Sequence, residues 1–134
     1  LRNAGHSVVK LMQPVAGPAV MVGSYTHPAF GTVMAELFAL CGQTALLSRG
    51  LEGEVVCDPR RTPQLDGFVR GTQLELQAQE PGTASDVPGL PQDITIEATA
   101  DYTRRVLAGA LPVPASIATQ VRHIVQLSTQ ASPA

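Results

Sequence analysis

This chain lacks several features that would narrow its function at once. It has no tryptophan, and aromatic residues make up only 4% of its 134 residues, so aliphatic side chains must build most of its core. No apolar run reaches the ~18–20 residues needed to span a bilayer. The opening residues have neither the basic start nor the apolar stretch of a secretory signal. We therefore expect a cytoplasmic protein with no membrane partner.

Motifs for metals, nucleotides and nucleophilic catalysis are also missing. Cys41, Cys57 and the three histidines lack metal-ligand spacing, so both thiols are expected to be free and no metal site is assigned. There is no GxGxxG or P-loop sequence and no recognisable Ser-His-Asp arrangement, so no catalytic residue is assigned either. The formal net charge is −2, so any binding of nucleic acid must come from local clusters of basic residues.

The apolar patterns that are present predict an α/β domain. Hydrophobic residues make up 44% of the chain, enough for one core. The runs Ala19–Gly23 and Thr44–Ser48 are typical of strands buried on both faces. Between them, helical spacing predicts a helix from Pro28 to about Leu40, with Gly42 just beyond its end. This order predicts a parallel βαβ unit with a right-handed crossover. The predicted buried stripe of the helix is Phe30, Val33, Met34, Leu37 and Leu40.

A short helix is expected before this unit, at His6–Met12, and a hairpin after it. The segments Asp66–Arg70 and Gln73–Gln77 are predicted to pair around Gly71. Polar and apolar residues alternate in the second arm, which predicts one solvated face. Prolines and glycines crowd residues 79–93, so a long flexible loop with little regular structure is expected there.

Two helices are predicted to close the domain, which we place at residues 1–127. The first runs from about Ile96 to Ala108, with Thr95 as N-cap and Gly109 as its stop. The second begins after Pro114, and residues 128–134 are expected to form a disordered tail. The residues predicted on the apolar side of the second helix are Ile117, Val121, Ile124, Val125 and Leu127.

The segment from Arg49 to Arg61 is the most informative part of the sequence. It directly follows a predicted buried strand, and ligands of open α/β sheets bind outside the carboxyl ends of strands. Gly50 and Gly53 would let a ligand approach the backbone closely. The alternative is a solvated loop whose charges pair with one another, at about 0–1 kcal/mol a pair. The candidate ligand-binding residues of this loop are Arg49, Glu52, Arg60 and Arg61.

Other basic residues offer weaker candidates for an anion site. Arg2, His6 and Lys10 are spaced at four residues and would share one face of an opening helix. His27 precedes a helix whose N-terminus favours anions, although a capping or turn role is the simpler interpretation. Arg60 and Arg61 could hold phosphate in a bidentate way, or they could answer the acids of their own loop. Arg104–Arg105 and Arg122–His123 are better interpreted as solvated helix faces.

Three stretches of the sequence are informative when they are taken together. They are residues 2–14 (RNAGHSVVKLMQP), 25–28 (YTHP) together with 49–54 (RGLEGE), and 100–114 (ADYTRRVLAGALPVP). These stretches resemble anthranilate phosphoribosyltransferases (glycosyltransferase family 3), and in particular a divergent DNA-binding branch. The match spans nearly all of this chain but only the C-terminal part of the family's chain.

This resemblance implies the C-terminal part of a phosphoribosyltransferase-like α/β domain. The family's enzymes transfer phosphoribosyl from phosphoribosyl pyrophosphate to anthranilate with magnesium, and form homodimers through an N-terminal helical domain that this chain lacks. Arg2 falls where the family contacts the anthranilate carboxylate. Val55 and Val56 fall where it has a metal-holding Asp-Glu pair, and valine cannot bind magnesium, which requires oxygen ligands.

Two functions follow as hypotheses from this resemblance. The first is a homodimeric protein that binds single- or double-stranded nucleic acid on a transferase fold, without anthranilate activity or a cofactor. The second is a phosphoribosyltransferase acting on anthranilate or another acceptor, with Mg²⁺. The valine pair favours the first hypothesis, and the net charge of −2 favours the second. By itself, this segment is expected to be inactive.

Overall fold

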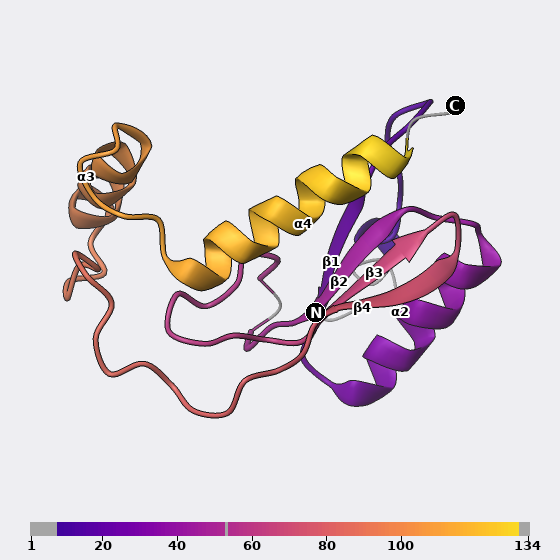
Figure 1. Ribbon diagram of the computed structural model, residues 1–134, viewed down its shortest axis with the longest axis horizontal. Helices are drawn as coiled ribbons and strands as arrows, with labels where there is room; N and C mark the ends of the chain where they lie inside the picture. Colours follow the sequence, from indigo (N-terminus) through magenta and orange to yellow (C-terminus); the bar gives the residue numbers. More distant parts are fainter. Residues whose placement is uncertain (1–7, 53, 132–134) are drawn as a thin grey trace.

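The computed structural model describes residues 8–52 and 54–131. Within them, four strands form one sheet in the order β1-β2-β3-β4 (Figure 1). Strand β1 (Met21–Tyr25) is parallel to β2 (Ala45–Arg49), and β3 (Leu65–Val69) and β4 (Thr72–Gln77) continue the sheet as an antiparallel hairpin. The predicted α/β class, parallel pair and hairpin are therefore confirmed.

Helix α2 (Pro28–Leu40) connects the two parallel strands, with the predicted bounds. Pro28 is well suited to the first position of the helix, because a backbone N–H there would have no partner within the helix. Gly42 ends it in the left-handed conformation, at a φ of 61°. The amide of Gln43 then donates to Phe38 O at 2.9 Å, which satisfies a carbonyl left open by the last turn.

Two helices cover opposite faces of the sheet, and each face has its own apolar cluster. Figure 1 shows α2 on one side of the strands and α4 (Ala115–Ala131) running across the other. On the α2 side, Phe38 and Phe68 meet edge-to-face with ring centroids 5.3 Å apart. The other buried residues of that cluster are Met34, Ala45 and Leu47. The buried cluster on the α4 side consists of Leu46, Cys57, Leu65 and Leu127.

The predicted buried stripe of α2 is wrong in most of its members. The helix buries Gly31, Met34 and Phe38 instead. Because Gly31 lets the ring of Tyr25 lie against the helix backbone, and Phe38 reaches Phe68, the buried face is rotated away from the predicted one. Leu37 is half-buried, and Phe30, Val33 and Leu40 are 56%, 58% and 85% exposed.

Helix α4 differs from its prediction in length and in its buried face. It continues to Ala131, so residues 128–131 are helical and not part of a disordered tail. No helix breaker precedes Pro133, and buried Leu127 fixes this end of the helix to the sheet. The face toward the sheet carries Ser116, Gln120 and Leu127, whereas Val121 and Val125 are exposed.

Helix α3 (Ile96–Leu107) forms where the sequence predicts it. The hydroxyl of Thr95 accepts from the Ala98 amide at 3.2 Å, and Gly109 has a φ of 73°. Residues 78–95 before it contain no helix or strand, as expected for a loop. Figure 1 shows α3 set apart from the sheet, and the helix buries none of its residues.

The outer strands are less buried than the sequence predicts. Strand β1 begins two residues later than expected and buries only Gly23 and Ser24, because it lies at the end of the strand order. Strand β4 is exposed along its first four residues on both faces, since it forms the other end. Of the expected opening helix, the described part ends in a turn, with the Leu11 amide donating to Val8 O at 2.9 Å. None of the helices in the described ranges is long and apolar enough to cross a membrane.

Candidate anion-binding site

Four separate segments meet at one edge of the sheet. Tyr25 and Arg49 end the parallel strands side by side, and both lead into loops at this edge. Because β3 runs antiparallel to β2, its first residue lies opposite Ser48, and the end of β4 returns to the same edge. The loops after β1, β2 and β4 and the segment before β3 are therefore neighbours, as the carboxyl-end rule predicts.

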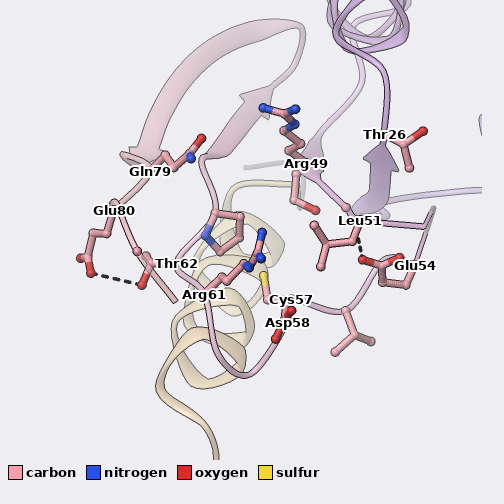
Figure 2. A pocket seen from close by; sticks show the side chains of 15 residues that line it. Thr26, Arg49, Leu51, Glu54, Cys57, Asp58, Arg61, Thr62, Gln79 and Glu80 are labelled. Atoms are coloured by element: carbon pink, nitrogen blue, oxygen red, sulfur yellow. Dashed lines mark hydrogen bonds between the residues drawn. The ribbon is translucent and has the colours of Figure 1, made fainter. Parts of the chain in front are cut away.

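These segments enclose a hollow of about 280 Å³. Figure 2 shows the lining residues, with Thr62, Gln79 and Glu80 on one side and Leu51, Glu54 and Thr26 on the other; Arg61 and Cys57 also line the hollow. Arg49 also lines it. The hydroxyl-bearing residues Thr26, Ser48 and Thr62 add donors from three different segments. Polar groups that converge in this way on one concavity are typical of a ligand site.

The three carboxylates that line the hollow already have partners. Glu54 turns back on its own loop, accepting from the amides of Leu51 at 2.6 Å and Glu52 at 2.7 Å. Asp58 accepts from the Arg60 amide at 2.8 Å and pairs with the Arg60 guanidinium. Glu80 accepts from the Thr62 hydroxyl at 3.2 Å. The acidic residues of the loop are thus used mainly to hold its shape.

The two arginines of the hollow differ from these carboxylates. In the part of the chain that the structure describes, neither Arg49 nor Arg61 forms an ion pair or hydrogen bond through its side chain. Both are exposed and both line the same concavity. A guanidinium presents several N–H donors in a rigid fork that matches carboxylate and phosphate oxygens. The arrangement is therefore suited to an anion with several oxygens.

The loop stabilises the negative charge of Glu54. The hydrogen bond from the Leu51 amide, together with that from Glu52, holds the pKa of Glu54 below its ordinary value of 4.5. Lys10 adds a smaller Coulombic lowering of this pKa, which places its ammonium near the loop. Lys10, a predicted site residue, therefore interacts electrostatically with Glu54, although it does not line the hollow.

Helix α4 contacts the loop at residues 55–58 through two buried polar side chains, those of Gln120 and Ser116. The Gln120 side chain, 4% exposed, accepts from the Cys57 amide at 3.0 Å and donates to Val55 O at 2.6 Å. One turn earlier, the Ser116 hydroxyl donates to Asp58 O at 2.8 Å. Burial raises the pKa of Cys57 to about 11, so its thiol stays protonated near neutral pH and is a poor nucleophile.

The structure brings together some of the predicted site residues and separates others. Arg49 and Arg61 line the hollow, whereas Arg60 pairs with Asp58 and lies outside it, so the pair does not act as one clamp. Glu52 is exposed and does not line the hollow. His27 is the N-cap of α2 without a side-chain hydrogen bond and also lies outside the hollow. Arg2 and His6 lie outside the described residues.

For Gly50, the structure gives a reason for glycine other than the close approach of a ligand. A side chain at Gly50 would meet Glu54 O at 2.9 Å, so glycine is needed here for the loop's own fold as much as for a ligand. Gly53 lies outside the described residues. Val55 and Val56 are exposed, and Val56 lines the hollow. Among residues 8–52 and 54–131, no three potential metal-ligating side chains come together.

Basic residues on the last two helices have other surroundings. Arg104 and Arg105 both pair with Asp101 on the exposed surface of α3, at 3.8 and 3.9 Å, as expected for a solvated face. Arg122 is exposed, but His123 is half-buried and its buried Nδ1 has no hydrogen-bond partner in the described chain. The prediction of a solvated face is therefore wrong for His123.

Sequence reasoning missed the residues that complete the site from a distance. Gln120 and Ser116 interrupt the apolar side of a predicted helix, which is the one signal that could have drawn attention to them. Thr62 and Glu80 gave no signal, because only the antiparallel return of β4 brings the segment around Glu80 beside the loop.

Comparison of the sequence with known proteins finds a similarity to an uncharacterized protein. A scan against protein-family models finds no family that matches the chain. Over 122 residues, or 90% of the chain, the sequence is 36% identical to the uncharacterized protein YbiB of Escherichia coli (strain K12). The chain spans only 38% of the length of YbiB, so the likeness concerns one part of that protein.

Proposed function

We propose that this chain supplies a phosphate-binding surface to a protein that binds nucleic acid. The observation that carries the proposal is the position of Arg49 and Arg61, which line one hollow without a partner among the described residues. In contrast, every carboxylate of the hollow has a donor of its own. An incoming phosphate would therefore meet two arginines that are not already engaged in ion pairs among the described residues.

Basic residues at this edge extend beyond the hollow, which favours a polymer with repeated phosphates. Lys10 lies near Glu54, and Arg60 is exposed on the same loop. A single small anion can occupy only the hollow, whereas a nucleic-acid backbone can also reach these outer cations. The resemblance to the divergent DNA-binding branch of glycosyltransferase family 3 supports the same proposal. Anthranilate transfer is not part of it, because Val55 and Val56 replace the expected metal-holding acids.

A second candidate, phosphoribosyl transfer to a small acceptor, is favoured by the size and mixed lining of the hollow. About 280 Å³ suits a small phosphorylated molecule better than a polymer. Glu54 and Glu80 could accept hydrogen bonds from sugar hydroxyls beside the two arginines. Magnesium would then have to be held by residues outside the Val55–Val56 positions.

Oligonucleotide binding by the full-length protein tests the proposal. The double variant Arg49→Ala with Arg61→Ala should weaken binding of a single-stranded oligonucleotide. The log–log salt slope should fall by roughly 0.7 for each phosphate that the variant no longer neutralises. The matched control is Arg104→Ala with Arg105→Ala, which removes two arginines that already pair with Asp101. If the control weakens binding as much as the test variant does, the proposed surface is wrong.

Competition separates the two candidates. If ribose 5-phosphate or pyrophosphate binds tightly and depends on Arg49 and Arg61 while oligonucleotides do not bind, transfer to a small acceptor becomes the better function. Oligonucleotide binding that depends on both arginines and is only weakly inhibited by these small anions would support nucleic acid.

A further inference from the structure

The buried side chain of Gln120 on α4 makes hydrogen bonds to the backbone of the loop at residues 55–57 that a neighbouring strand could otherwise make. The Gln120 amide exchanges two hydrogen bonds with the backbone on either side of Val56, at 3.0 Å to the Cys57 amide and 2.6 Å to Val55 O. A neighbouring strand would offer the same pair of one acceptor and one donor. These contacts span more than sixty residues of sequence and involve a side chain that is 4% exposed.

The same helix also fixes the turn that carries Arg61. The Ser116 hydroxyl donates to Asp58 O at 2.8 Å, and that carbonyl accepts in turn from the Arg61 amide at 3.2 Å. Asp58 is further held by the Arg60 amide at its carboxylate. Hydrogen bonds therefore connect Ser116 through Asp58 O to the backbone of Arg61. Gln120 holds the backbone at Val55 and Cys57, directly before that turn in the chain.

We propose that Gln120, assisted by Ser116, is a positioning residue that sets Arg61 for phosphate binding at this hollow. The inference rests on the proposed function, since it assigns a role in binding an anion. Gln120 touches no ligand; it acts through the backbone of Val55 and Cys57. If its amide holds the conformation that binds phosphate, phosphate must stabilise that conformation by the same factor, because the coupling between two linked equilibria is reciprocal.

Cys57 reports directly on this conformation. Its side chain is buried at 5% exposure, and its amide is one of the two groups that Gln120 holds. Release of the loop would expose the thiol to an alkylating reagent. Cys41 is exposed and would react without any such opening. The measurement therefore needs a background in which Cys41 is replaced by serine and Cys57 is the reporting cysteine.

The experiment compares Gln120→Met with Gln126→Met in the full-length protein on that background. Methionine keeps the length of glutamine and removes both hydrogen bonds, and Gln126 is an exposed glutamine of the same helix. Inorganic phosphate is the probe, with its affinity and the rate of Cys57 alkylation measured together. In the unsubstituted background, phosphate should slow alkylation. Gln120→Met should bind phosphate roughly tenfold more weakly, since the buried Cys57 amide and the part-buried Val55 carbonyl lose their partner. Cys57 should be alkylated faster in Gln120→Met than in the unsubstituted background. Gln126→Met should change neither the phosphate affinity nor the alkylation rate.

The outcomes are separable. Faster alkylation of Gln120→Met with unchanged phosphate affinity would overturn the positioning role and leave the proposed function intact. Phosphate binding that is absent, or that survives loss of Arg49 and Arg61, would reject the proposed function itself. Should Gln120→Met fail to fold, Ser116→Ala takes its place, because it removes one bond and almost no volume. Ser116→Ala should weaken phosphate binding several-fold, with recovery in Ser116→Thr; unchanged affinity in a folded Ser116→Ala would overturn the inference.

Discussion

Adjacent residues of the site loop have opposite roles. Arg60 folds back on Asp58, with its Nε 3.5 Å from the carboxylate, whereas Arg61 faces the hollow without such a partner among the described residues. The sequence offered two equal arginines, and nothing in their spacing distinguishes them. The difference comes from the turn at Asp58, whose carbonyl accepts from the Arg61 amide and whose carboxylate accepts from the Arg60 amide.

Single substitutions should therefore separate the two arginines. Arg61→Ala should weaken phosphate binding by the full-length protein more than Arg60→Ala, because only Arg61 offers an open fork to the hollow. The expected loss for Arg61→Ala is about tenfold, the scale of one charge-assisted hydrogen bond. Isothermal titration with inorganic phosphate measures both. Equal losses would mean that the pair acts as one clamp after all.

Glu54 predicts a specific dependence of stability on pH. Its pKa is lowered from 4.5 in the folded protein, so its contribution is present above that value and disappears as pH falls through the folded pKa. The difference in Tm between the wild type and Glu54→Gln should therefore favour the wild type at pH 7 and shrink steadily below about pH 4.5. Other carboxylates titrate in both proteins and cancel. A difference that is constant from pH 7 to pH 3 would contradict this assignment.

At the scale of elements, the ends of α2 and α3 were predictable, whereas the C-terminal end of α4 and the buried faces of α2 and α4 were not. Thr95, Gly42 and Gly109 act through hydrogen bonds and dihedral angles within a few residues, so the sequence alone sufficed for them. The buried face of α2 depends on Phe68 from a strand that lies far along the chain. Likewise, α4 buries Gln120, which exchanges hydrogen bonds with Val55 and Cys57, and leaves Val121 exposed.

Paired truncations on α4 test which of its faces is buried. Leu127 is 1% exposed in the cluster with Leu46 and Leu65, whereas Val125 is 58% exposed. Leu127→Ala should lower the free energy of unfolding by about 2–5 kcal/mol. Val125→Ala should change it by less than about 0.5 kcal/mol. Urea denaturation of the full-length protein measures both. Comparable losses would show that α4 lies against the rest of that protein through the Val125 face as well.

At the scale of the whole molecule, the site is assembled from segments that lie far apart in the sequence. The charged loop could be located because it follows a buried strand, and Arg49 and Arg61 were among its candidates. The segment around Glu80 could not be found, because only the antiparallel hairpin brings it to this edge. Ser116 and Gln120 gave one signal, as polar residues on the apolar side of a predicted helix, but the sequence did not show that they reach the loop. Local chemistry thus indicated where the site lies, and the sheet topology decides which residues complete it.

Several large apolar side chains of α2 and α3 are exposed in this chain. Phe30, Val33 and Leu40 are more than half exposed on α2, and Ile96 and Leu107 are 83% and 82% exposed on α3. Exposed apolar patches beyond a few hundred Å² are uncommon on soluble monomers and promote association. The chain spans only 38% of the length of YbiB, and further segments of a protein of that length could cover these faces.

We therefore expect the 134-residue segment, expressed by itself, to self-associate and to bind a hydrophobic dye. Val33→Lys with Leu40→Lys should reduce the apparent mass in light scattering and the dye fluorescence, because both side chains lie on the open face of α2. Thr32→Lys, also exposed on α2, adds charge without removing an apolar group and should have a smaller effect. In the full-length protein, the same double lysine variant should instead destabilise the fold if these residues are covered there. A segment that is monodisperse and monomeric, and unfolds cooperatively without dye binding, would show that the exposed faces need no partner.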